Sequence, residues 1–127
     1  MDTALEITRK QDRDGRTVLA VRGEIDTHTG PRLRNALTEQ VARTTALVLD
    51  VSGAVLIDAA GLRVLTAAQR HAADLGKPPI TLRGVRPLLA KTLHLAGLDH
   101  LFPREPAPDP VLATHRGPTT TPIPAAA

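Results

Sequence analysis

Two carboxylates near the start of the chain are the first candidates for chemistry. Glu24 and Asp26 lie two residues apart at the end of an expected strand, so their side chains can point the same way. A carboxylate pair of this kind can do general acid–base work. The pattern is commoner at a solvated loop edge beside a helix start. We therefore predict that this pair is not catalytic and that the chain is not an enzyme.

Other residue types that carry chemistry are sparse. The five histidines, at positions 28, 71, 94, 100 and 115, show no cluster with ligand spacing, and the chain has no Cys. Its single serine, Ser52, lies outside a Gly-x-Ser-x-Gly elbow and suits a turn at Ser52-Gly53. No glycine-rich phosphate loop is present. We expect neither a metal nor a cofactor.

The segment Ile57-Asp58-Ala59-Ala60-Gly61-Leu62 is different in character. It joins an apolar strand to a helix, and Asp58 is placed to cap that helix. Gly61 would keep the helix start free of side-chain bulk, so that another surface can approach closely. A helix start also carries unpaired N–H groups and partial positive charge. An ordinary capped helix explains these features as well as a binding surface does.

The elements that position these residues follow from the spacing of apolar residues, which changes along the chain between the period of a strand and the period of a helix. Strand patterns cover residues 5–8, 18–22, 46–51 and 80–83, with a hairpin turn at Asp14-Gly15. One helix begins at Thr29-Gly30-Pro31, with Thr29 as its cap, and carries an apolar stripe at 33, 36, 37 and 41. Helices over 58–75 and 85–95 follow, and residues 98–102 suit a short last strand. The order predicts an α/β fold with a mixed, mostly parallel sheet of four to five strands and covering helices.

The composition changes at Pro103. Seven of the eleven prolines fall in residues 103–127, and few large apolar residues accompany them. We expect one domain over residues 1–102 and a disordered, Pro-rich tail over 103–127.

Charge and hydropathy exclude several kinds of partner. The net charge of +3 comes from scattered residues, and Phe102 is the only aromatic residue, so a platform for stacking bases is missing. The N-terminus lacks the pattern of a signal peptide, and no apolar run approaches the roughly 20 residues of a membrane span. We predict a cytoplasmic protein without direct nucleic-acid contact or membrane insertion.

Two motifs give the sequence a family resemblance. Residues 47–65, which contain Asp58-Ala59-Ala60-Gly61-Leu62, resemble the signature of STAS domains, where a hydrophobic strand leads to Asp-Ser-[Ser/Ala/Thr]-Gly-Leu. Upstream, Gly23-Glu24-Ile25-Asp26 resembles the family's Gly-Glu-Leu-Asp segment at the end of the second strand. The resemblance covers about residues 3–102.

The resemblance implies an anti-sigma factor antagonist. Such a protein binds an anti-sigma factor, usually a serine kinase with the ATP-binding fold of histidine kinases, and releases a sigma factor. The kinase reverses this by phosphorylating the serine that follows the motif Asp. That phospho-acceptor position is Ala59 here, and Ala60 has no hydroxyl either, so the resemblance implies binding without the usual switch.

Both motifs follow strand ends, so we expect them at one edge of the sheet, where loops form sites. Three other functions remain open: docking on the ATPase of an ABC-type transporter, a scaffold that does not switch, and a small enzyme or nucleotide-binding domain. The last would need a ligand pocket, for which the sequence offers no lining of aromatic or converging polar groups. The expected partner-binding residues are Asp26, Thr27, His28, Asp58, Ala59, Ala60, Gly61, Leu62, Arg63 and Thr66.

Overall fold

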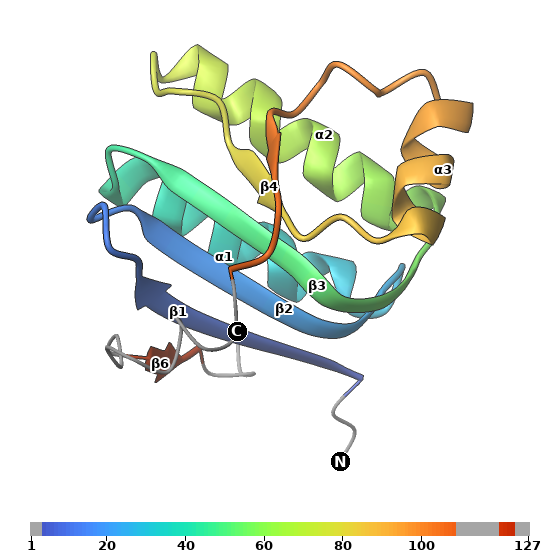
Figure 1. The fold of residues 1–127 in the computed structure, drawn as a ribbon, viewed down its shortest axis with the longest axis horizontal. Helices are drawn as coiled ribbons and strands as arrows, with labels where there is room; N and C mark the ends of the chain where they lie inside the picture. The colour runs from blue at the N-terminus through green and yellow to red at the C-terminus, as the bar shows by residue number, and fades with distance from the viewer. Residues whose placement is uncertain (1–3, 109–119, 124–127) are drawn as a thin grey trace.

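Strands and helices alternate along most of the chain. The computed structural model describes residues 4–108 and 120–123 (Figure 1). The predicted order of elements is confirmed through the third helix. The elements are β1 (Leu5–Gln11), β2 (Thr17–Ile25), α1 (Gly30–Arg43), β3 (Leu47–Ile57), α2 (Ala59–Asp74), β4 (Thr81–Arg83), α3 (Pro87–Leu95), β5 (Arg104–Glu105) and β6 (Thr120–Pro122).

The strands form one mixed sheet in the order β5-β4-β3-β2-β1-β6. The β1–β2 hairpin is antiparallel, and β6 pairs antiparallel with the other edge of β1. From β2 to β5 each neighbouring pair is parallel. The predicted fold class is therefore confirmed, and the described sheet has six strands where four to five were expected.

The first two helices pack against each other and bury their apolar stripes on the sheet (Figure 1). The stripe predicted for α1 is buried throughout. In α2 the stripe ends earlier than expected, because Leu75 is the C-cap residue and is exposed. The buried apolar side chains of the two helices are Leu33, Ala36, Leu37, Val41, Leu65, Ala68 and Ala72.

The turn expected at Ser52-Gly53 is wrong, because β3 runs through it to Ile57. The Asp50 carboxylate accepts hydrogen bonds from the Ser52 amide at 2.9 Å and from the Ser52 hydroxyl at 2.7 Å. Two register shifts against β2 mark bulges, which bend the strand without ending it. A Cβ on Gly53 would lie 2.9 Å from the carbonyl oxygen of Val21, so the close approach of β2 favours glycine there.

The strand expected at 98–102 is also wrong. These residues form turns, from which Phe102 reaches into the core. The strand lies instead at β5, beyond the boundary expected at residue 102. The segment expected to be a disordered tail also contains β6, while its residues 109–119 and 124–127 lie outside the described part of the chain.

A charged cluster explains why so short a strand as β5 is held in place. It comprises Asp12, Arg16, Arg83 and Glu105, and we call it the hairpin–β5 cluster. Glu105 accepts from Arg16 Nη1 at 3.0 Å and from Arg83 Nε at 2.8 Å, and Asp12 accepts from Arg83 Nη2 at 3.1 Å. The cluster ties the β1–β2 turn to β4 and to β5, the edge strand on the opposite side of the sheet from β1. Charge therefore compensates for the few backbone bonds of β5.

Candidate functional site

The two segments singled out in the sequence lie side by side at one edge of the sheet. The paired strands β2 and β3 end at Ile25 and Ile57, which are opposite each other in register. The Asp58 amide donates to the carbonyl oxygen of Ile25 at 3.2 Å, so the two following loops begin in contact. The expected juxtaposition is therefore present in the fold.

The β2–α1 loop is shaped by the Asp26 carboxylate. One oxygen accepts from the backbone N–H groups of His28 and Thr29, each at 2.9 Å. The hydrogen bond from the N–H of Thr29 is the main cause that lowers the pKa of Asp26. Burial opposes this effect, and the hydrogen bond from the N–H of His28 adds to the lowering. Asp26 is therefore ionised at neutral pH, and the loop leaves Thr27 and His28 exposed to solvent.

Thr29 does not cap α1 through its side chain, contrary to expectation. Its hydroxyl donates to the carbonyl oxygen of Glu24 at 2.6 Å and accepts from the Asp26 amide at 3.1 Å. These bonds fix the entry of the loop instead of the first turn of the helix. Since the Asp26 carboxylate is used in shaping the loop, the Glu24–Asp26 pair is not arranged as a free acid–base couple.

The β3–α2 loop contains the predicted helix cap. Asp58 accepts from the Gly61 amide at 2.9 Å, which confirms it as the N-cap of α2. The prediction that Gly61 leaves room for a partner surface is wrong. Gly61 is buried, and a Cβ there would lie 2.6 Å from the carbonyl oxygen of Ile25. Glycine at this position lets the start of α2 pack closely against the end of β2, and Gly61 itself offers no surface to a partner.

The remaining expected residues divide into exposed and supporting positions. Ala59 and Arg63 are exposed and Ala60 is half-buried. Leu62 packs against the core, and the hydroxyl of Thr66 donates a hydrogen bond to the carbonyl oxygen of Leu62 at 2.8 Å. The exposed expected residues at this edge are Thr27, His28, Asp58, Ala59 and Arg63.

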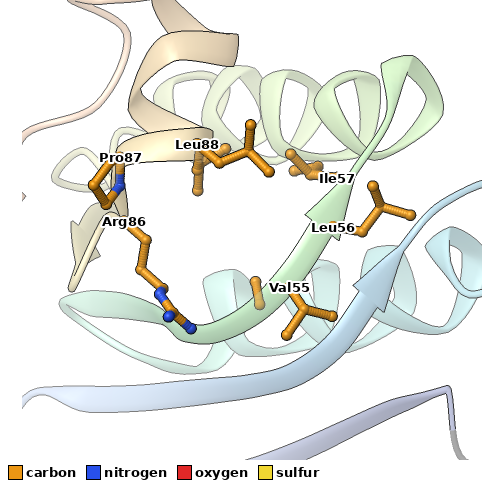
Figure 2. Close-up of a pocket in the computed structure, with 8 residues that line it drawn as sticks. Val55, Leu56, Ile57, Arg86, Pro87 and Leu88 are labelled. Carbon is orange, nitrogen blue, oxygen red and sulfur yellow. The ribbon is translucent and has the colours of Figure 1, made fainter.

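Sequence reasoning missed an apolar groove beside these loops. It has a volume of about 270 Å³ and lies between the end of β3 and the start of α3 (Figure 2). Val55 and Leu88 on its walls are 60% and 62% exposed. The apolar run at 46–51 predicts a strand buried on both faces, and its strand residues Leu47 to Val51 are buried. The exposed apolar residues lie farther along β3, at Val55 and Leu56, in the part of the strand that contains the bulges, and the sequence gave no signal of those bulges.

Metal chemistry has no candidate site in the described part of the chain. Across residues 4–108 and 120–123, no group of three His, Cys, Asp or Glu side chains could hold a metal ion. The Nδ1 atom of His94 lies 2.7 Å from an Asp99 carboxylate oxygen, in an exposed pair at the end of α3. Within the same residues no helix is long and apolar enough to cross a membrane.

Comparison with known proteins agrees with this fold. The family model described as "Mlab, STAS domain" matches residues 8–103. The anti-sigma-F factor antagonist RsfB of Mycobacterium tuberculosis is 36% identical over 92 residues, which are 72% of this chain and 74% of that protein. The crystal structure of an anti-sigma factor antagonist from Mycobacterium paratuberculosis superimposes with a TM-score of 0.67 at 29% identity, over 91% of this chain and 95% of that one.

A more distant structure shares the fold alone. The phosphorylated form of the Bacillus cell fate determinant SpoIIAA gives a TM-score of 0.62 at 14% identity, over 86% of this chain and 97% of that chain. The region matched by the STAS family model, residues 8–103, contains every strand and helix from β2 to α3, including both loops at the sheet edge. This chain belongs to the STAS domain family.

Proposed function

We propose that this protein is an anti-sigma factor antagonist, which binds an anti-sigma factor and thereby releases a sigma factor. The observation that carries the proposal is the contact between the two loops, in which Asp26 shapes one and Asp58 caps the helix after the other. It occurs in a chain 36% identical to an anti-sigma-F factor antagonist. The protein acts by binding and not as an enzyme.

The surface proposed for the partner is the edge formed by these loops and the first turns of α2. Its exposed part comprises Thr27, His28, Asp58, Ala59 and Arg63. Asp26, Gly61, Leu62 and Thr66 hold this part in place through the contacts described above. The proposed partner is an anti-sigma factor of the serine-kinase type, with the ATP-binding fold of histidine kinases.

A charge reversal at Arg63 tests the proposal. The purified chain is titrated calorimetrically against the purified anti-sigma factors of its own genome, and we expect one of them to bind and to release its sigma factor. Arg63→Glu should weaken that binding at least about tenfold, the range of an interface residue that contributes strongly. The matched control is Arg13→Glu, because Arg13 is an exposed arginine in the β1–β2 turn at the opposite edge of the sheet.

The outcomes separate the candidate functions. If no anti-sigma factor binds and an ABC-type ATPase co-purifies with the chain, transporter docking replaces the proposal. If an anti-sigma factor binds but no sigma factor is released, the chain is a scaffold. Equal weakening by Arg63→Glu and Arg13→Glu would contradict the placement of the surface.

A further inference from the structure

The groove beside the two loops has walls of a different kind from the loops themselves. Figure 2 shows Ile57 and Leu88 facing each other across it, with Val55 and Leu56 on β3 and Arg86 reaching from the start of α3 toward β3. Ile57 immediately precedes Asp58, so the groove is continuous with the proposed partner surface.

The side chains on these walls are unusually exposed for their type. Val55, Leu56 and Leu88 are 60%, 44% and 62% exposed. A grouped, exposed apolar patch is typical of an interaction site, whereas single apolar residues on a surface are common. Burying three such side chains against a partner is favourable, because it removes apolar area from water.

Arg86 is the one charged residue that lines the groove. Its Nη1 donates only to the carbonyl oxygen of Ser52, at 3.4 Å, and none of the ion pairs found among the described residues includes it. A partner that covers this groove therefore meets an exposed guanidinium beside an apolar hollow. The complementary group is an apolar side chain with a carboxylate close by.

The size of the groove favours a protein side chain over other occupants. At about 270 Å³ and open on one side, it falls below the roughly 300–1,000 Å³ of small-molecule sites and offers few polar groups. A stable dimer of this chain would bury about 1,200–2,000 Å² in total, far more than three side chains supply. One or two side chains of a larger partner fit the space.

We infer that the groove is an anchor site for the anti-sigma factor, which inserts an apolar side chain between Ile57 and Leu88 and pairs a neighbouring Asp or Glu with Arg86. The inference rests on the proposed function and adds a second contact region to it. It predicts that affinity depends on α3 as well as on α2.

The test compares two leucines on the same helix. The full chain carries Leu88→Ala or, as the matched control, Leu95→Ala, because Leu95 is 74% exposed on α3 and does not line the groove. Each is titrated against the anti-sigma factor that binds the wild-type chain. We expect Leu88→Ala to weaken binding at least about fivefold and Leu95→Ala to change it less than twofold, as in a surface with few strong anchors. Arg86→Glu should also weaken binding, with a smaller loss at high salt.

The remaining outcomes each decide the inference. Equal affinity of Leu88→Ala and wild type would overturn the groove as an anchor site and leave the proposed function intact. If the wild type binds no anti-sigma factor, the anchor site and the proposed function are both wrong. Stronger binding by Arg86→Glu would overturn the proposed pairing of Arg86 with an Asp or Glu of the partner. Sedimentation that shows a wild-type dimer, and a monomer for Leu88→Ala, assigns the groove to a second copy of the chain and overturns the inference.

Discussion

Among single residues, the one after Asp58 bears most directly on regulation. Ala59 is exposed at the start of α2, where a phosphate would add about −1.5 to −2 charge beside the Asp58 carboxylate. Alanine has no oxygen to accept it. The hydroxyls of Ser52 and Thr66 already donate to Asp50 and to the Leu62 carbonyl, and neither residue lies in the first turn of the helix. We therefore expect the binding surface to stay competent in the presence of a kinase.

Restoring the hydroxyl at this position tests that expectation. The wild-type chain and Ala59→Ser are incubated with the cognate anti-sigma kinase and ATP and weighed by mass spectrometry. Wild type should gain no phosphate, and the variant should gain one and lose affinity for the kinase. Its fold should persist, because a helix N-terminus tolerates negative charge. Phosphate on wild-type Ser52 or on a threonine, with loss of binding, would contradict the idea. A variant that stays unmodified would favour a scaffold or a transporter subunit.

Among the elements, β5 depends on charges contributed by distant parts of the chain. Bonds from Arg16 and Arg83 lower the pKa of Glu105, against the effect of burial. Burial alone would raise the pKa of Asp12, but hydrogen bonds from Arg16 and Arg83 outweigh it and lower that pKa below its usual value. Both carboxyls thus have a lower pKa in the folded state than in the unfolded state. Their contribution to stability is present above the unfolded values near 4 and is lost as the pH falls through the folded values.

Neutralising Glu105 should reproduce that loss at neutral pH. We expect Glu105→Gln to lower the free energy of unfolding by about 1–3 kcal/mol at pH 7, because the buried Arg83 loses a charged acceptor. The difference from wild type should shrink as the pH falls through the lowered pKa of wild-type Glu105, because the wild-type carboxyl then becomes protonated too. Urea melts at pH 7 and at a series of acid pH values measure it. The control is Glu39→Gln, which breaks the exposed pair with Arg43 and should cost less than about 0.5 kcal/mol. An equal loss in the two variants would contradict the role of the cluster.

What could be predicted from the sequence follows from how local each signal is. The Asp58 cap and the apolar stripe of α1 depend on residues within a few turns, and both are confirmed. The bulges of β3 depend on the register with β2, and an apolar run reads the same with or without them. The strand β5 depends on contacts with Arg83 and with Arg16 of the β1–β2 turn, which are distant in the sequence. Its local sequence is rich in proline and therefore gave no signal of a strand.

At the scale of the whole molecule, the sheet extends past the domain boundary expected at residue 102, because β5 pairs with β4. A chain ending there loses Glu105 and the pairing of β5 with β4, whereas a chain ending at 108 keeps both. We expect the 1–108 chain to melt at least about 4 °C above the 1–102 chain, because about 1 kcal/mol shifts the melting temperature of a domain of 60–100 residues by roughly 4–8 °C. The full chain should differ less from 1–108, since β6 adds three residue pairs at an edge and Ile123 is only partly buried. Calorimetric melts of the three chains at pH 7 decide it. Equal melting temperatures for 1–102 and 1–108 would mean that the core is equally stable without β5, and that the hairpin–β5 cluster does not contribute to the stability of the fold.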